Sequence, residues 1–346
     1  MKVGLALAGG GVKGSYQIGA YYAFKKCHVK FDGIVGTSIG AANGAGIASG
    51  RAKELLEMWK NINPGELLEI EPSLIKDFKN NEDKLKQMKA YYKISKGMIS
   101  SHGFTTRNIR DLMCDIIDVD TLKNNNIDFG LATYNFSKRK PVYIFKENIK
   151  KDNFIDYIMA SCSLPIFKLE KVIDDNFYID GGFYDNCPSN MLLNKNYDLV
   201  YEVKINGVGL LRKPINSNGK IITISPSRDN GSIVEMNHER IIDNIYMGYY
   251  DTLKVLNKYW GYKYIFNKTY LVNYDKLVKK TDKFTLRRVY NFFNVNDSRE
   301  AIIKSLEYLM EKNNYNYNEI YNIKKVIKSI KYKEMFIYQF IKGLSI

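Results

Sequence analysis

Residues 3–44 read VGLALAGGGVKGSYQIGAYYAFKKCHVKFDGIVGTSIGAANG, and this stretch decides the fold. A short apolar run, residues 3–8, ends in a glycine-rich turn, and a helical pattern begins at Ser15. A second apolar run, residues 32–35, leads into a G-x-S-x-G turn and then into a helix of small residues at 41–48. The order strand, turn, helix, strand, turn, helix predicts a βαβ unit with one further helix. If the two strands are parallel neighbours, both turns open at the same edge of the sheet.

The two turns together predict a nucleophile beside an anion-binding pocket. The second turn reads Gly36-Thr37-Ser38-Ile39-Gly40, and a tight strand-to-helix turn of this kind holds the serine Oγ out at its tip. The first turn, residues 9–14, reads GGGVKG and can present backbone N–H groups to the same space. A serine that attacks an ester carbonyl needs such donors for the oxyanion, and it also needs a base.

The sequence offers two candidates for the base. The chain has three histidines, His28, His102 and His238, and only His238 comes late enough for a Ser–Asp–His order. Its polar helical surroundings favour a surface position. Asp180, which precedes two glycines, is the other candidate. A free aspartate has a pKa of roughly 3.9, which suits base work poorly, but partial burial would raise it. Alternatively, an aspartate before two glycines is only a good turn former.

Taken together, these blocks resemble the signatures of patatin-like phospholipases. The matching blocks are Gly9–Gly14, Gly36–Gly40 and Asp180-Gly181-Gly182, with support from Ala160–Pro165, Phe167 and Asn186-x-Pro188. They span residues 1 to about 190 in the order that the family shows. The resemblance implies an α/β fold: a three-layer α/β/α core, related to α/β hydrolases, with a Ser–Asp dyad in place of a triad.

The resemblance also assigns roles. It implies that Ser38 is the nucleophile and Asp180 its base, in a phospholipase A-type hydrolysis of lipid ester bonds through an acyl-enzyme and without a cofactor. The oxyanion loop implied by the family comprises Gly9, Gly10, Gly11, Lys13 and Gly14. The motif-supporting residues are Gly36, Gly40, Gly181, Gly182 and Asn186. Ala8 departs from the family, many of whose members carry an acidic residue or a serine there, and nothing beyond about residue 230 matches it.

Length and pattern predict one large domain with an appendage. With 346 residues and 45% hydrophobic content, the chain can bury a large core. We expect a catalytic domain at 1–230 and a basic helical extension at 231–346. The stretch 61–105 is too long for a simple connection, so we expect either a lid over the site or a plain helical insertion. After Pro226 we expect no strand and several helices, the longest at 232–259.

The charge is uneven along the chain. The net charge is +15, and residues 201–346 hold 25 Lys/Arg against 14 Asp/Glu, or +11. This asymmetry suggests an anionic partner, or it reflects only a lysine-rich composition. Residues 322–346 predict a basic amphipathic helix that lies on an anionic membrane, or else a helix packed on a core. We expect a phospholipid or other acyl-lipid substrate, peripheral membrane contact through these helices, and no nucleic acid, because no recognisable module for one is present.

Cysteine spacing and hydropathy bear on location. Cys27, Cys114, Cys162 and Cys187 are scattered without C-x-x-C spacing, which favours reduced thiols in a cytoplasmic protein. No apolar run reaches the roughly 18–20 residues that cross a bilayer, and we expect no signal peptide. No carboxylate cluster indicates a metal site. We therefore expect a cytoplasmic protein that associates peripherally with membranes.

Two other functions are compatible with parts of the sequence. Gly9-x-Gly11-x-x-Gly14 matches the fingerprint of NAD(P)-binding oxidoreductases. The acidic residue at the expected distance, Asp32, precedes the second strand instead of closing it, which disfavours this function. A catalytically inactive membrane-binding adaptor is the other alternative, and the presence of both Ser38 and Asp180 argues against it.

Overall fold

The computed structural model describes residues 1–62, 107–164, 171–234, 237–268, 274–331 and 336–344. Apart from its first two residues, the insertion expected at 61–105 lies outside the described residues. The chain separates into two compact units, Met1–Asp251 (unit 1) and Thr252–Ile346 (unit 2), and each is described by itself.

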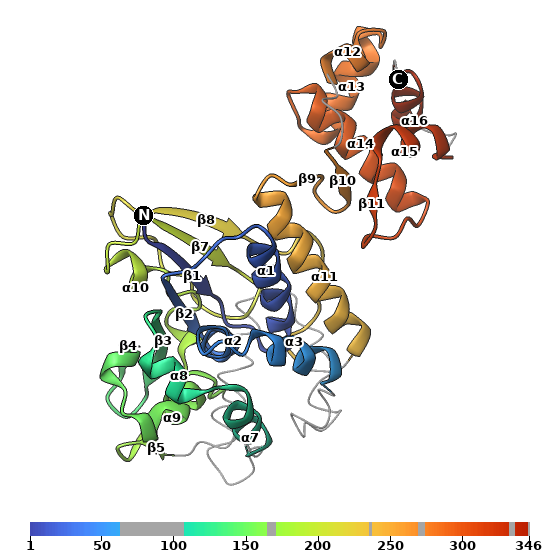
Figure 1. The fold of residues 1–346 in the computed structure, drawn as a ribbon. Helices are drawn as coiled ribbons and strands as arrows, with labels where there is room; N and C mark the ends of the chain where they lie inside the picture. The colour runs from blue at the N-terminus through green and yellow to red at the C-terminus, as the bar shows by residue number, and fades with distance from the viewer. Residues whose placement is uncertain (63–106, 165–170, 235–236, 269–273, 332–335, 345–346) are drawn as a thin grey trace. The chain divides into compact units, whose positions relative to one another are not determined.

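Unit 1 is built on a mixed sheet of eight strands among its described residues, in the order β5-β6-β3-β2-β1-β7-β8, with β4 paired to β3 (Figure 1). The strands are β1 Val3–Leu7, β2 Gly33–Thr37, β3 Asp128–Asn135, β4 Lys140–Phe145, β5 Lys171–Ile173, β6 Asn176–Asp180, β7 Leu199–Val203 and β8 Lys220–Ile224. The neighbouring strands β3, β2, β1, β7 and β8 are all parallel, whereas β4 and β6 lie antiparallel to β3. The predicted parallel pairing of the first two strands is confirmed, with Gly4 beside Gly33 and Leu7 beside Gly36.

Helices cover both faces of this sheet, as a three-layer α/β/α core requires. The α-helices are α1 Ser15–Lys26, α2 Ile39–Ala48, α3 Ala52–Asn61, α7 Arg107–Ile116, α8 Val119–Asn124, α9 Phe154–Ser161, α10 Asn190–Leu193 and α11 His238–Val255. The 3₁₀ turns are η1 Gly11–Gly14, η2 Lys146–Asn148, η3 Lys151–Asn153 and η4 Gly181–Phe183. Gly4 packs against Leu192 of α10, whereas Leu7 and Ile34 reach Gly44 of α2 on the opposite face. The central strands are therefore buried on both sides, as parallel strands usually are.

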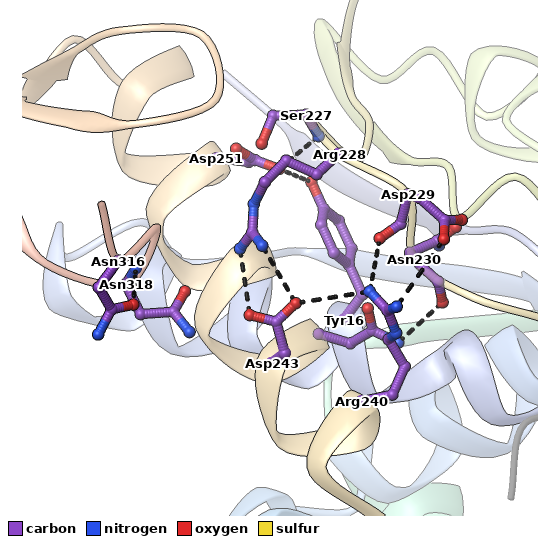
Figure 2. Close-up of polar contacts among 11 residues, drawn as sticks. Tyr16, Ser227, Arg228, Asp229, Asn230, Arg240, Asp243, Asp251, Asn316 and Asn318 are labelled. Carbon is purple, nitrogen blue, oxygen red and sulfur yellow. Dashed lines mark hydrogen bonds and ion pairs between the residues drawn. The ribbon is translucent and has the colours of Figure 1, made fainter. Parts of the chain in front are cut away.

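Helix α11 is tied to α1 by backbone packing and by a buried carboxylate. A Cβ atom on Gly19 would overlap the carbonyl oxygen of Ile245, so the two helices approach as closely as glycine allows. The Asp251 Oδ2 atom accepts hydrogen bonds from the Tyr16 hydroxyl at 3.0 Å and from the Ser227 N–H at 2.9 Å (Figure 2). Because of these contacts, the boundary between the units lies within α11, later in the chain than the expected boundary at 230.

Unit 2 contains short strands that the sequence analysis did not predict. They are β9 Tyr259–Trp260, β10 Ile265–Asn267 and β11 Ile320–Tyr321, in the order β11-β10-β9. The expectation of no strand after Pro226 is therefore wrong, because runs of two or three residues are too short to show a strand period. The helices are α12 Tyr274–Val278, α13 Lys283–Phe293, α14 Ser298–Lys312, α15 Ile323–Ser329 and α16 Phe336–Lys342.

The C-terminal apolar stripe packs inside unit 2. The residues of the stripe are buried in the hydrophobic core of this unit: Ile323, Ile327, Ile330, Ile337, Ile341 and Leu344. The stripe is divided between α15 and α16, and the chain is extended at Ile330. This arrangement matches the core-packed alternative and leaves the stripe with no free apolar face for a lipid surface. No helix in the described part of the chain is long and apolar enough to cross a membrane.

The contact between α1 and α11 predicts a stability effect. We expect Gly19→Ala to destabilise the protein by about 1–3 kcal/mol, because the added methyl group forces two backbones apart. Urea unfolding followed by circular dichroism measures the change. The matched control is Gly44→Ala in α2, whose methyl group would lie 3.1 Å from the Ile34 Cγ2 atom, a side-chain group that can shift. Equal stability of the two variants would contradict the proposed role of the close backbone contact.

Candidate active site

Ser38 occupies a strained turn between β2 and α2. Strand β2 ends at Thr37 and α2 begins at Ile39, so Ser38 alone connects the strand to the helix. Its backbone angles are φ 56° and ψ −131°, a conformation that non-glycine residues rarely adopt. Its side chain is only 5% exposed. Strain of this kind persists where the surrounding structure imposes it, and it concentrates at functional sites.

The glycines on both sides of Ser38 make this turn sterically feasible. A Cβ atom on Gly36 would overlap the carbonyl oxygen of Gly40, and one on Gly40 would overlap that of Leu7 at the end of β1. The turn is therefore pressed against its own helix and against the neighbouring strand. A side chain at either position would push Ser38 out of place.

Asp180 reaches Ser38 through the pairing of β6 with β3. Asp180 lies opposite Thr133 in the antiparallel pair, and β3 in turn pairs with β2, with Ala132 opposite Thr37. Two strand pairings therefore bring residues far apart in sequence to the same edge of the sheet. A Cβ atom on Gly181 would overlap the carbonyl oxygen of Ala132, so the turn after Asp180 needs glycine for this close approach.

The Asp180 carboxyl group is buried and has a raised pKa. Its side chain is 3% exposed, and Oδ1 accepts a hydrogen bond from the Gly182 N–H at 2.8 Å. Burial raises the pKa of Asp180 to about 6, and hydrogen bonding from the Ser38 hydroxyl and the Gly182 N–H opposes the rise. The Asp180 Oδ2 atom accepts no well-aligned hydrogen bond from the described residues. The Ser38 hydroxyl is therefore close enough to lower the pKa of the carboxyl group but is not aligned for a good hydrogen bond. Such contacts are often loose before substrate binds.

Asn186 ties the glycine loop to the turn after Asp180. The Gly9 N–H donates to the Asn186 carbonyl at 3.0 Å, and the Asn186 Nδ2 atom donates to the Gly9 carbonyl at 3.2 Å. A Cβ atom on Gly9 would lie 3.0 Å from the Cβ atom of Ser38. The first glycine of the loop is therefore packed between Asn186 and Ser38.

Within the loop, the backbone N–H groups differ in what they contact. The Lys13 N–H donates to the Gly10 carbonyl at 3.3 Å, and the Val12 N–H donates to the Ile233 carbonyl at 3.1 Å. The N–H groups of Gly10 and Gly11 donate to no backbone carbonyl of the described residues. The Lys13 side chain is buried, and its Nζ atom donates to the Asn206 carbonyl at 3.1 Å.

Buried amide side chains fix both ends of the loop. The Gln17 Nε2 atom donates to the Ala8 carbonyl at 2.6 Å, and the Asn43 Nδ2 atom donates to the Gly14 carbonyl at 3.0 Å. Asn43 also donates to the Gln17 Oε1 atom at 2.9 Å and accepts from the Trp59 Nε1 atom at 3.0 Å. No sequence motif pointed to Gln17 or Asn43. The available signal was a lone asparagine within the small-residue helix at 41–48.

The segment between β8 and α11 supports the loop from outside the motifs. Gly11 has φ +57°, and a Cβ atom there would overlap the carbonyl oxygen of Ile233. Figure 2 shows how this segment is held, with Asp243 between the guanidinium groups of Arg228 and Arg240. Asn230 extends the support, since its Nδ2 atom donates to the Ile205 carbonyl at 2.8 Å. No motif pointed to these residues, because they act through backbone contacts.

Ser161 supports the nucleophile directly. The Ser161 Oγ atom accepts the Ser38 N–H at 2.8 Å and donates to the Ala132 carbonyl at 2.7 Å. This hydroxyl therefore links the strained turn to β3. Ser161 belongs to Ala160–Pro165, one of the blocks that support the resemblance. Two residues of that resemblance, Pro165 and Phe167, lie outside the described residues.

An apolar cavity begins at Ser38. Residues of α3, α7 and other segments line it, among them Met58, Trp59, Leu112, Met113, Leu164 and Ile233. Cys162 also lines it, and burial, together with the charge of Asp180, raises the pKa of this thiol. The wall next to the nucleophile is therefore hydrophobic.

The other candidate groups among the described residues lie away from Ser38. Of the histidines, His28 and His238 are exposed, whereas His102 lies outside the described residues. The Asp32 Oδ2 atom accepts the Val3 N–H at 2.7 Å, at the edge of the sheet where β1 begins, so it does not face the glycine loop as a ribose-binding carboxylate would. Among the described residues, no three His, Cys, Asp or Glu side chains gather as metal ligands.

Relatives of this chain include proteins of known family. A family model described as patatin-like phospholipase matches residues 5–193. Uncharacterized NTE family proteins of Mycobacterium bovis and Mycobacterium tuberculosis are 24% identical over 208 residues, which cover 60% of this chain and 49% of theirs. The chain therefore spans about half the length of the curated relatives it matches.

Two solved structures align with most of the chain. VipD from Legionella pneumophila has 14% identity and a TM-score of 0.47, over 95% of this chain and 79% of that one. The type III effector protein ExoU has 13% identity and a TM-score of 0.39, over 98% of this chain and 71% of that one. The family model covers more than half of the chain, including the glycine loop, Ser38 and Asp180. The chain therefore belongs to the patatin-like phospholipase family.

Proposed function

We propose that this protein is a serine esterase that hydrolyses carboxylic ester bonds of phospholipids or related lipids, as a phospholipase A does, with Ser38 as nucleophile and Asp180 as base. One observation carries the proposal. A buried serine in a strained turn lies beside a buried carboxyl group whose pKa is raised to about 6. A carboxylate with this pKa is mostly deprotonated at neutral pH and is still basic enough to accept a proton. No histidine is needed to bridge the two side chains.

The reaction proceeds in two halves. The Ser38 Oγ atom attacks the ester carbonyl carbon while its proton passes to Asp180, and a tetrahedral oxyanion forms. Collapse of this intermediate breaks the bond to the alcohol, which takes the proton from Asp180 and leaves as the lysolipid. The acyl group remains on Ser38 as an ester. Water then attacks this ester and gives a proton to Asp180, and the fatty acid leaves as Ser38 regains its proton.

We assign the oxyanion to the N–H groups of Gly10 and Gly11. The N–H groups of Gly9 and Lys13 already donate to the carbonyls of Asn186 and Gly10. Gly9 and Lys13 therefore shape the loop in this proposal, as does Gly14, whose carbonyl accepts from the Asn43 Nδ2 atom. The N–H groups of Gly10 and Gly11, which donate to no backbone carbonyl of the described residues, stabilise the charge. Loss of one such donor typically costs about 3–4 kcal/mol of transition-state stabilisation.

The cavity at Ser38 suits the acyl chain of the substrate. Its wall is formed by methionine, leucine, isoleucine and tryptophan side chains from α3, α7 and the segment before α11. An acyl chain in this cavity removes apolar surface from water, which is favourable by roughly 0.8 kcal/mol per buried methylene. The lipid chain therefore contributes binding energy while the ester is held at Ser38.

Peripheral contact of the C-terminal helices with an anionic membrane is a subsidiary proposal. Lys324, Lys325, Lys328 and Lys331 are exposed, whereas the neighbouring apolar residues are buried in the core of unit 2. These helices therefore offer charge alone, and such contact weakens as salt is added.

The dyad predicts a specific pattern of variants. We expect Ser38→Ala and Asp180→Asn each to lower ester turnover by roughly 10³- to 10⁴-fold, because each removes one half of the proton transfer. Hydrolysis of a fluorogenic lipid ester measures the loss, and a fluorophosphonate probe reports labelling of Ser38. His238→Ala is the control and is expected to keep nearly full activity. Strong loss in His238→Ala with full activity in Asp180→Asn would replace the dyad with a triad.

The raised pKa predicts the pH dependence of the reaction. Asp180 accepts a proton only when it is ionised, so kcat/KM should rise with pH through an apparent pKa of about 6 and level off above it. A pH–rate profile with a soluble ester measures this step. A rate already constant down to pH 4.5 would exclude Asp180 as the base.

The same pKa predicts a cost in stability. Because the folded pKa of Asp180 lies above the unfolded value, the folded state binds more protons between pH 4 and pH 6 and is destabilised as the pH rises through this window. Asp180→Asn removes the buried charge and should increase the free energy of unfolding at pH 8 by about 3 kcal/mol. The increase should vanish near pH 4. Chemical unfolding at both pH values tests this, and a variant less stable than the wild type at pH 8 would contradict it.

A further inference from the structure

The loop between β7 and β8 exposes large aliphatic side chains. Residues 210–218 are all exposed. Leu210, Leu211 and Ile215 are 42%, 51% and 38% exposed, within six consecutive residues of this loop. Single exposed apolar residues are ordinary in folded proteins. A cluster of them is typical of a surface that binds a membrane or another molecule.

The backbone of this loop is fixed to the candidate active site. The Leu210 N–H donates to the Gly182 carbonyl at 2.9 Å, and the Asn186 N–H donates to the Leu210 carbonyl at 2.6 Å. Earlier in the loop, a Cβ atom on Gly207 would overlap the carbonyl oxygen of Gly9. The loop therefore packs on the turn after Asp180 and on the glycine loop, at the edge of the sheet that carries Ser38. The leucine side chains stay exposed although the backbone is held.

Cationic and aromatic groups adjoin the leucines. The Arg212 guanidinium lies 3.7 Å from the centre of the Tyr184 ring, and its Nε atom donates to the Tyr184 carbonyl at 2.8 Å. The Tyr143 ring, 42% exposed, lies edge-on to Tyr184. Lys213 is exposed beside Arg212. Leucine, tyrosine, arginine and lysine together form the composition that lies stably at a boundary between lipid headgroups and acyl chains.

We propose that residues 210–215 dock on an anionic phospholipid surface. The side chains of Leu210 and Leu211 enter the boundary between headgroups and acyl chains, and Arg212 and Lys213 contact lipid phosphates. Because the loop backbone is bonded to the turn after Asp180, this docking brings the edge of the sheet with Ser38 to the lipid. The inference rests on the proposed function and adds to it a surface by which an aggregated substrate is approached.

Binding tests the loop separately from catalysis. In a Ser38→Ala background, which leaves the vesicles intact, Leu210→Ser with Leu211→Ser should lower binding to phosphatidylcholine vesicles containing phosphatidylserine by about tenfold or more. Lys213→Glu should lower binding to these vesicles and not to vesicles of phosphatidylcholine alone. The matched control is Phe284→Ser with Ile320→Ser, which removes two apolar side chains that are 77% and 45% exposed in unit 2. The control should bind as the parent does.

Activity gives the second readout. With Ser38 intact, the loop variant should lose turnover of vesicle lipid and keep turnover of a short-chain ester dissolved as monomers. Equal loss on both substrates would overturn the proposal, because the loop would then act by supporting the site. Unchanged vesicle binding would also overturn it. If the wild type cleaves neither substrate, the proposed function fails, whereas the binding experiment still decides the role of the loop.

Discussion

The structure depends on turns that meet at the carboxyl edge of the sheet at distances that only glycine permits. Gly40 packs on the carbonyl of Leu7, Gly181 on that of Ala132, and Gly9 between Ser38 and Asn186. Each contact leaves no room for a side chain at that position. Asp180 is therefore buried beside Ser38, and its pKa rises because the charged form loses solvation. Close backbone packing thus leads directly to the proposed chemistry.

The proposed site keeps its geometry at the expense of stability. Ser38 is held in a disfavoured backbone conformation, and the buried carboxylate destabilises the folded state at neutral pH. The surrounding structure offsets both costs. Ser161 holds the Ser38 N–H, and Gln17 and Asn43 hold the ends of the glycine loop from inside the core. These amide and hydroxyl groups are buried and hydrogen-bonded, so they make the glycine loop and the Ser38 turn more rigid.

The support extends beyond the part of the chain that the family model covers. The match ends at residue 193, yet Gly207 packs on the glycine loop and Ile233 accepts the Val12 N–H. The segment that carries Ile233 is fixed in turn by α11, through Asp243 and Asp251. Residues up to 251 are therefore part of the unit that shapes the site. The exposed loop at 210–215 is hydrogen-bonded to the same framework. A membrane docked on this loop would therefore lie next to the edge of the sheet that carries Ser38.

The sequence by itself determined the local features. Apolar runs and glycine turns at 3–44 specified the βαβ unit and placed Ser38 in a sharp turn, because strand period and turn geometry depend on neighbouring residues. The two glycines after Asp180 made it one candidate for the base, and the resemblance of the motifs assigned it that role. Only the tertiary structure decided that the β6–β3 and β3–β2 pairings bring Asp180 to Ser38, and only there does burial set its pKa. The strands β9 to β11 and the buried C-terminal stripe likewise depend on partners distant in sequence, which no local pattern encodes.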